Sequence, residues 1–507
     1  MGQVEKKLNI VGENSNLIND IGDTFTDEII IGLCGPIGTN IKLTGERIKS
    51  LLSDNYNYIC INIKLSDFIS EHTRNSEIKI NESIFDRYNR LIKEGNTLRE
   101  QYGSSILAQF AVNEITLNRE IYKQKHEDDG YKNMRYCYVI DSIKNIDEYL
   151  LLKSIYGDIF YFIGIYSSLS QRVLLLEEKG LKLEEVYKLV DKDSGEEFDY
   201  GQKVSKTFIK SDYFLRLDVN SKNLDKKLSR FLSLLFNSDI ITPYNHETAM
   251  YLATTASSNS ACLSRQVGAC ITDSEGEVLS IGWNDVPKFG SYVYSHNDEN
   301  DDRCYLKENG ICFNDREKNK INDLLYQELL KSRVISAVDK DKVMSVLKKS
   351  RIKELLEFSR AVHAEMLALI KAGHKSGDAM IGGSLYCTTY PCHNCARHII
   401  ASGIKNVYYI EPYNKSLATS LHVDSITDNE TDTSKVRILM YDGISPSRYL
   451  HFFKMYDNKR KLNGIKINKS KRNISPKKTL SLSAIPHLEK QVTLSLQQNK
   501  LLKINND

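Results

Sequence analysis

Two short motifs contain the residue types from which a catalytic metal site can be built. The first is His363-Ala-Glu365, and the second is Pro391-Cys392-His-Asn-Cys395. Cys392 and Cys395 are three residues apart, so on a helix they would share one face of its first turn. The partial positive charge of a helix N-terminus favours thiolates, and a proline suits the entry to a helix. Two thiolates and the His363 imidazole therefore offer Zn²⁺ three ligands and leave the fourth tetrahedral position to water.

Glu365 is the residue that points to catalysis. It is too close to His363 in the chain to be a comfortable second ligand, but it can lie beside the zinc water. Zinc lowers the pKa of such a water to roughly 7, and a neighbouring carboxylate can take its proton. The same carboxylate can deliver the proton to a ring nitrogen and later protonate a departing amine. The two motifs therefore predict hydrolytic deamination with Glu365 as the catalytic acid and base.

A closed, structural zinc site is the alternative interpretation of the same residues. His393 or His398 would then supply a fourth ligand. Structural zinc sites usually draw on two ligand pairs at zinc-finger spacing, and they have no use for a glutamate such as Glu365. The catalytic interpretation is therefore favoured.

The segment between Pro287 and Leu355 contains three further candidate ligands, His296, Cys304 and Cys312. They could form part of a second, structural zinc site, although they lack a CxxC pair. Free thiols in a loop that gates access of the substrate are the favoured interpretation.

The pattern of apolar and polar segments predicts an α/β protein with two domains. In residues 25–238, buried strand patterns alternate with helical segments, which is typical of a parallel sheet with helices on both faces. Residues 245–456 contain both motifs at the starts of helices, between further strands. We expect residues 1–24 to be a flexible lead-in and residues 457–507 to be a basic tail with little order.

A glycine-rich loop follows the first expected strand, Glu28 to Leu33. Aligning the Walker A motif on Gly35 places Ile41 at the position of its lysine and Lys42 at that of its Ser or Thr. The loop could still hold an anion at the start of the next helix, whereas phosphoryl transfer is disfavoured without these groups. The residues at which we expect a nucleotide to bind are Gly35, Gly38, Thr39, Asn40 and Lys42.

Composition and charge exclude several classes of protein. The chain is 41% apolar and 27% charged, as in soluble globular proteins, and no segment approaches the roughly 18 apolar residues of a membrane span. Ten cysteines in 507 residues are too few for a disulfide scaffold, so we expect a cytoplasmic protein. From Asp457 onward there are twelve basic and three acidic residues, whereas the preceding body is mildly acidic. This distribution does not suit a protein that grips a long nucleic acid across its main surface.

Residues from about Asn245 to Tyr456 resemble the deoxycytidylate deaminase family of the cytidine deaminase superfamily. The H-x-E and P-C-x-x-C pair is typical of zinc nucleobase deaminases. Three flanking segments add to the resemblance: Ser264-Arg-Gln-Val-Gly-Ala269, Gly282-Trp-Asn284-Asp-Val-Pro287 and Leu385-Tyr-Cys-Thr-Thr-Tyr-Pro-Cys392. The resemblance implies a five-stranded mixed sheet flanked by helices, with Asn284 on the deoxyribose and Arg265 near the phosphate. An exposed ion pair for Arg265 and a turn role for Asn284 are the alternatives.

More of the chain resembles the antiphage deoxycytidylate deaminases of bacteria, which join an N-terminal P-loop domain to the deaminase. Three segments carry this resemblance: Glu411-Pro-Tyr-Asn-Lys415-Ser-Leu-Ala, Leu421-His-Val-Asp424 and Gly443-Ile-Ser-Pro-Ser-Arg448-Tyr. It implies deamination of dCMP and dCTP, which depletes dCTP during phage infection, with Lys415 near a triphosphate. It also implies a hexamer, and an inhibitory small RNA is a second interpretation of the basic tail.

The N-terminal half also resembles small-molecule kinases of the P-loop class. Asp141 ends a strand as a Walker B aspartate does, and Arg172 resembles a lid arginine. A nucleotide site is one expectation, and a kinase fold that has become a scaffold or sensor is the other.

Two further functions compete with the deamination of free nucleotides. One is the deamination of bases in RNA or single-stranded DNA, which the acidic body and the G-x-N-x-x-P loop disfavour. The other is an RNA-regulated sensor whose deaminase site is silent.

Overall fold

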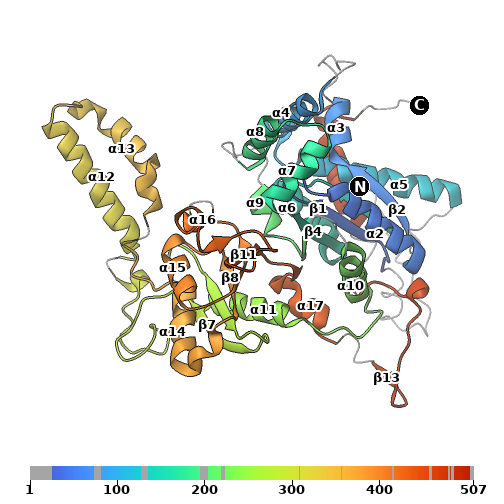
Figure 1. Ribbon diagram of the computed structural model, residues 1–507. Helices are drawn as coiled ribbons and strands as arrows, with labels where there is room; N and C mark the ends of the chain where they lie inside the picture. The colour runs from blue at the N-terminus through green and yellow to red at the C-terminus, as the bar shows by residue number, and fades with distance from the viewer. Residues whose placement is uncertain are drawn as a thin grey trace, which may run out of the picture. The chain divides into compact units, whose positions relative to one another are not determined.

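The computed structural model divides into two compact units, described separately below (Figure 1). Unit 1 comprises Met1–Ile241 and Leu450–Asp507, and unit 2 comprises Thr242–Tyr449. The α/β class expected from the sequence is confirmed, but the chain after Tyr449 belongs to unit 1 and forms no separate tail. The structure describes residues 25–72, 82–126, 135–194, 204–217, 223–307, 309–355, 357–413, 416–455, 460–477, 480 and 485–502.

No helix within these described ranges combines the length and the apolar character needed to cross a membrane.

Unit 1 is built on a parallel sheet whose strands follow the order β5-β4-β1-β3-β2. All residues of β1 are buried. Because successive side chains of a strand point to opposite faces, helices must cover both faces of the sheet. The strands are β1 (Ile29–Cys34), β2 (Ile59–Lys64), β3 (Tyr136–Asp141), β4 (Phe160–Tyr166) and β5 (Tyr213–Arg216).

The helices of unit 1 follow the strands as expected for a doubly wound sheet. Several of them begin at residues that cap them, such as Ser83 and Ser168, whose hydroxyls accept backbone N–H groups of the first turn. The helices are α2 (Ile41–Tyr56), α3 (Leu65–His72), α4 (Ile84–Tyr102), α5 (Ile106–His126), α6 (Ile146–Tyr156), α7 (Leu169–Glu178), α8 (Leu183–Ser194), α9 (Val204–Phe208), α10 (Leu224–Phe236), α17 (Tyr449–Phe453) and α18 (Ile485–Gln498).

The expectation of little order after residue 457 is wrong for α18, which packs against α5. Glu489 on α18 accepts hydrogen bonds from Arg119 Nη1 at 2.6 Å and from the Tyr156 hydroxyl at 2.8 Å. The same guanidinium lies 2.5 Å from Glu28, just before β1, and Arg119 is only 1% exposed. The tail is therefore fixed to the sheet by a buried charge cluster, which composition alone does not reveal.

Unit 2 contains a six-stranded mixed sheet in the order β10-β11-β9-β8-β6-β7. β6 runs antiparallel to β7 and β8, whereas β8, β9, β11 and β10 are parallel to one another. The sixth strand, beyond the five expected, is the two-residue β10 at the edge. The strands are β6 (Gly268–Thr272), β7 (Val278–Trp283), β8 (Ser384–Thr389), β9 (Asn406–Glu411), β10 (Ile426–Thr427) and β11 (Val436–Met440), followed by β12 (Gly443–Ile444).

Two glycines let helices approach the opposite faces of this sheet. A Cβ atom on Gly268 would lie 1.9 Å from the Ala253 carbonyl oxygen of α11 (Asn245–Ser257). A Cβ atom on Gly282 would lie 2.3 Å from the Ala364 carbonyl oxygen of α14 (Ala364–Ser376). Gly282 pairs with Ala269, the neighbour of Gly268, so the two helices cover different faces. Close contact with α14 explains the glycine of the G-x-N-x-x-P segment.

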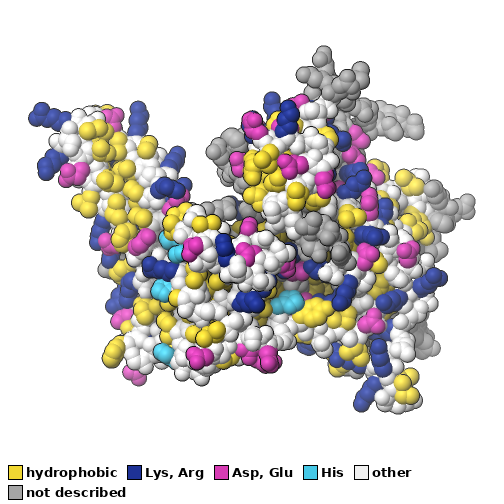
Figure 2. All heavy atoms as spheres, in the orientation of Figure 1, with side chains coloured by type: hydrophobic (Ala, Val, Ile, Leu, Met, Phe, Trp, Pro, Cys, Tyr) yellow, Lys and Arg dark blue, Asp and Glu magenta, His cyan; other side chains and the backbone are white. Residues whose placement is uncertain are grey.

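The segment between β7 and α14 contains a helical hairpin, α12 (Phe313–Lys331) and α13 (Lys340–Lys349) (Figure 1). Figure 2 shows hydrophobic side chains along this hairpin, and Leu324, Val334 and Val338 are among the exposed ones. The remaining helices of unit 2 are α15 (His393–Ala401) and α16 (Ala418–Leu421).

Candidate active site

The start of each of two neighbouring helices contributes to one cluster of candidate metal ligands. His363 immediately precedes α14, Cys392 immediately precedes α15, and Cys395 lies in the first turn of α15. Both sulfur atoms lie 3.4 Å from His363 Nδ1. The three ligand atoms are within 4.8 Å of one another, and they form the single such His, Cys, Asp or Glu group among the described residues. Two thiols and an imidazole at this spacing fit a zinc ion.

Hydrogen bonds within the cluster shift the ionisation of its members. The pKa of Cys392 is lowered to about 4, first by the hydrogen bond from Cys395 and also by that from His363. The pKa of His363 is raised to about 9, chiefly by its hydrogen bond with Cys392. Cys392 is therefore a thiolate at neutral pH, which is the form that binds a metal. Binding of a metal would release the imidazole proton.

Glu365 lies in the first turn of α14 and is 4% exposed. Burial raises the pKa of its carboxyl group, and the charge of His363 opposes this effect. Its neighbour Cys387 is fully buried and donates a hydrogen bond to the Thr389 carbonyl at 2.6 Å. A raised pKa makes the carboxylate a better proton acceptor, as acid–base catalysis requires.

Glu365, His363 and Cys392 line a cavity of about 220 Å³ within unit 2. Its walls come from the segment before β6, the loop after β7, the insertion around α12, and the ends of β8 and β9. The other lining residues are Cys262, Ser264, Arg265, Val267, Asn284, Asn314, Ser359, Ala361, Ala364, Thr389, Tyr390 and Tyr413.

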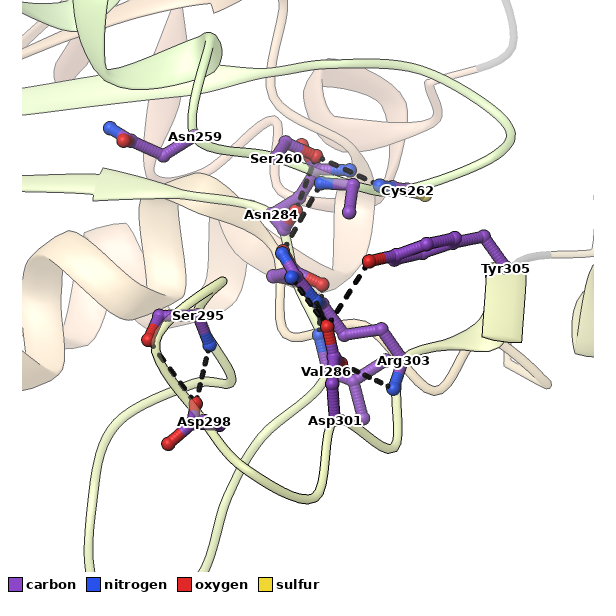
Figure 3. Close-up of polar contacts among 12 residues, drawn as sticks. Asn259, Ser260, Cys262, Asn284, Val286, Ser295, Asp298, Asp301, Arg303 and Tyr305 are labelled. Atoms are coloured by element: carbon purple, nitrogen blue, oxygen red, sulfur yellow. Dashed lines mark hydrogen bonds and ion pairs between the residues drawn. The ribbon is translucent and has the colours of Figure 1, made fainter. Parts of the chain in front are cut away.

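Asn284 lines this cavity, but the side-chain amide also forms hydrogen bonds with the backbone of the segment before β6. Oδ1 accepts a hydrogen bond from Val267 N at 2.7 Å, and Nδ2 donates one to the Arg265 carbonyl at 2.8 Å. The Ser260 hydroxyl donates to the Asn284 carbonyl at 2.6 Å, as Figure 3 shows. One N–H and one lone pair of the amide are left for a ligand. Asn284 therefore positions the Arg265–Val267 segment, a role that its place in a turn did not suggest.

Arg265 lies at the edge of the cavity, with its side chain 44% exposed. Its guanidinium is 3.4 Å from Glu411 and 5.9 Å from the centre of the Tyr413 ring. The ion pair predicted as an alternative is thus present, and the charge still faces the cavity. Lys415, the other expected phosphate contact, lies outside the described residues.

Arg303 anchors the insertion beside the cavity, which sequence reasoning missed. It is 5% exposed and lies 3.5 Å from Asp285, the residue after Asn284. It also contacts Asp301 at 2.5 Å, and the Tyr305 hydroxyl donates to Asp301 at 3.2 Å (Figure 3). The acidic run before Arg303 was the signal that could have indicated an ion pair.

The second zinc site considered for the insertion does not form. His296 is exposed and joins no group of three metal-ligand atoms among the residues that the structure describes. Cys304 and Cys312 are free thiols beside a smaller cavity that Cys262 also lines. His393 and His398 do not join the main cluster either, so a closed four-ligand site is not supported.

The glycine-rich loop of unit 1 connects β1 to α2 at the carboxyl end of the sheet, where doubly wound folds bind ligands. The donors of Thr39 are used within the loop itself. Thr39 N and the Thr39 hydroxyl both donate to the Pro36 carbonyl, at 3.2 and 2.8 Å. Asn40 precedes α2 without a capping side-chain bond, and Lys42 is 77% exposed and 3.8 Å from Glu46. Lys42 and Asp141 both line a cavity of about 140 Å³, and the nucleotide site expected at this loop stays a prediction.

The two kinase-like residues of unit 1 have other partners. Asp141 accepts a hydrogen bond from the Ser142 hydroxyl at 2.9 Å, and burial raises the pKa of its carboxyl group. Arg172, on α7, donates from Nε to the Ile37 carbonyl at 2.7 Å. The predicted lid arginine therefore holds the loop itself.

Unit 2 is similar to parts of several known proteins. The family model of the cytidine and deoxycytidylate deaminase zinc-binding region matches residues 243–411. The deoxycytidylate deaminases of Enterobacteria phages T4 and T2 are each 30% identical to this chain over 171 residues, covering 33% of it and 79% and 81% of those enzymes. The crystal structure of the dCMP deaminase of cyanophage S-TIM5 in complex with dCMP and dUMP is 21% identical, with a TM-score of 0.24, covering 40% of this chain and 99% of that one.

Unit 2 thus contains a zinc-binding deaminase domain. The chain belongs to the cytidine and deoxycytidylate deaminase family.

Proposed function

We propose that the protein deaminates the free nucleotides dCMP and dCTP to their uracil forms and so depletes dCTP in antiphage defence. The observation that carries the proposal is the buried Glu365 carboxyl beside three converging metal-ligand candidates in one cavity. The similarity to phage enzymes that act as deoxycytidylate deaminases supports the substrate class. The hexamer and the small-RNA control that the sequence suggested stay predictions.

His363 Nδ1 and the sulfur atoms of Cys392 and Cys395 would hold the zinc ion. When bound, zinc supplies a Lewis acid that makes water easy to deprotonate near neutral pH. Glu365 accepts one proton of the attacking water and passes it to the cytosine N3. It then takes the second proton from the hydroxyl group now on C4 and delivers it to the amine, which leaves as ammonia while the C4 carbonyl of uracil forms. Arg265, at the edge of the cavity, provides positive charge for the phosphate, and Lys415 adds to it for a triphosphate.

Ammonia release from dCMP, dCTP and a single-stranded DNA oligonucleotide tests this function directly. We expect turnover of one or both free nucleotides and none of the oligonucleotide, because the cavity is lined from several sides and the insertion is anchored at its edge. Turnover of the oligonucleotide alone would instead identify a polynucleotide deaminase. A protein that contains zinc but turns over none of the three would support a silent site.

Asn314 is a further polar residue of the cavity, contributed by the first turn of α12. Its Nδ2 donates to the Leu355 carbonyl at 3.4 Å, which fixes the orientation of the amide because a carbonyl can only accept. Oδ1 is then buried and has no hydrogen-bond partner within the described part of the chain. It can accept from the 3′-hydroxyl, the one donor of ionised dCMP besides the amine that leaves.

Asn314→Ala is expected to lower kcat/KM for dCMP by about 3–10-fold, the usual net value of one hydrogen bond. The same substitution should leave kcat/KM for 2′,3′-dideoxycytidine monophosphate unchanged, because that substrate lacks the donor. Steady-state kinetics of both proteins on both nucleotides measure the coupling. An equal loss on the two substrates would show that Asn314 does not contact the 3′-hydroxyl.

A further inference from the structure

The loop between β1 and α2 has the sequence position of a phosphate-binding loop, and three of its backbone N–H groups donate within the chain. Pro36 has no N–H group, and the N–H groups of Thr39 and Ile41 donate to carbonyls within the loop. The third of these donors is Ile37, whose N–H group donates to a carboxylate from a distant part of the chain. Asp193 Oδ2 accepts this hydrogen bond at 2.6 Å.

Asp193 lies near the end of α8 and behaves as a buried, fully partnered anion. Its side chain is 2% exposed, and its second oxygen accepts from Lys144 Nζ at 2.7 Å. Lys144 follows β3 by three residues, so its ammonium reaches the loop from the neighbouring strand. A backbone N–H group and a lysine ammonium on one anion are the donors that phosphate-binding loops offer to phosphate oxygens.

Residues of α7 and α8 pack against the loop next to this carboxylate. Ile37 belongs to an apolar cluster with Leu176 on α7 and with Val186 and Leu189 on α8. A Cβ atom on Gly38 would lie 3.0 Å from both the Cβ atom and the carbonyl oxygen of Arg172. The helices α7 and α8 therefore pack directly against the part of the loop that Asp193 contacts.

We propose that Asp193 is an internal substitute for a phosphate group, and that unit 1 keeps an anion site which accepts a phosphate-bearing ligand only when this carboxylate is absent or withdrawn. The class of ligand is a pyrophosphate or nucleoside triphosphate, whose oxygens would take the place of the carboxylate oxygens on Ile37 N and Lys144. This inference does not depend on the deaminase activity of unit 2. It explains how a loop without the Walker A lysine keeps its fold: the anion that binds to the loop is the Asp193 carboxylate, a side chain of the same protein.

Titration of the full-length protein with pyrophosphate, followed by calorimetry at low salt, tests the proposal. Asp193→Ala removes the charge and vacates the position of the carboxylate, so we expect pyrophosphate to bind at least about tenfold more tightly than to the wild type. The matched control is Glu184→Ala, the loss of a carboxylate at a position of α8 where the side chain is 80% exposed. It should bind pyrophosphate as the wild type does. Adding Lys144→Ala to Asp193→Ala should abolish the gain.

A folded Asp193→Ala protein that binds pyrophosphate no better than Glu184→Ala would overturn the proposal. Asp193→Ser provides a second variant, with a small uncharged side chain at this position. If neither variant folds, refolding with added pyrophosphate decides the question, because the ligand should restore the missing anion. Failure of pyrophosphate to raise the yield of folded protein would count against the proposal as clearly as a failed titration.

Discussion

Glu365→Gln is expected to lower kcat for deoxycytidine nucleotides by about 10²–10⁴-fold, the usual contribution of a general acid–base residue. Glutamine keeps the shape of the side chain but cannot move a proton between the attacking water, N3 and the departing amine. Glu365 is buried at the cavity wall but is not one of the three converging ligand candidates, so bound zinc should be retained. Ammonia release and zinc content, measured on the same preparation, give both quantities.

Two control variants separate this role from metal binding. Cys392→Ala removes a candidate ligand, so zinc and turnover should be lost together. Glu275→Gln makes the same charge change at an exposed position between β6 and β7, and it should keep both zinc and turnover. If Glu365→Gln lost zinc to the extent that Cys392→Ala does, Glu365 would have to be reassigned as a ligand.

The candidate metal site could be predicted from the sequence because its chemistry depends on residue type and short spacing. Cys392 and Cys395 must lie at the start of one helix, and a proline directly before them indicates that start. His363 and Glu365 are likewise a local pair. The structure brings His363, Cys392 and Cys395 together as candidate ligands. The only long-range information that this prediction needed was that the two motifs lie side by side in the fold.

The roles of Asn284 and Asn314 could not be predicted in the same way. An amide can donate and accept, so its role depends on which backbone groups the fold brings near it. Val267 and Arg265 take up most of the Asn284 amide, whereas Leu355 takes only one N–H group of Asn314. The partners of Asn314 depend on how the segment between β7 and α14 packs against the rest of unit 2, and no sequence motif indicates that packing.

The glycine-rich loop shows a related limit. The sequence correctly places a loop between β1 and α2, but the carboxylate that accepts a hydrogen bond from it is that of Asp193, far along the chain. The helix α18 was missed for a different reason. Its flanking residues are polar and basic, which favours disorder by composition. The buried positions Ile485, Glu489, Val492 and Leu496 do recur at helical spacing, and that periodicity was the available signal.

Arg119→Met is expected to lower the free energy of unfolding of unit 1 by about 3–5 kcal/mol, the cost of removing one partner from a buried ion pair. The variant leaves Glu28 and Glu489 buried without the guanidinium that contacts them at 2.5 and 2.6 Å. Burial already raises the pKa of Glu489, an effect that Arg119 opposes, so loss of the arginine leaves little to hold the carboxylate ionised. Urea unfolding followed by circular dichroism measures the change in stability.

Glu489→Gln is the matched control, because it leaves Arg119 paired with Glu28 and makes the buried charges equal in number. It should cost clearly less than Arg119→Met, since no buried charge is then left without a partner and the Tyr156 hydroxyl can still donate to the amide oxygen. The difference between the two variants isolates the cost of unpaired charge from that of lost packing. If Arg119→Met were as stable as Glu489→Gln, α18 would be held by its apolar face alone, and the charge cluster would not be what fixes the end of the chain to the sheet.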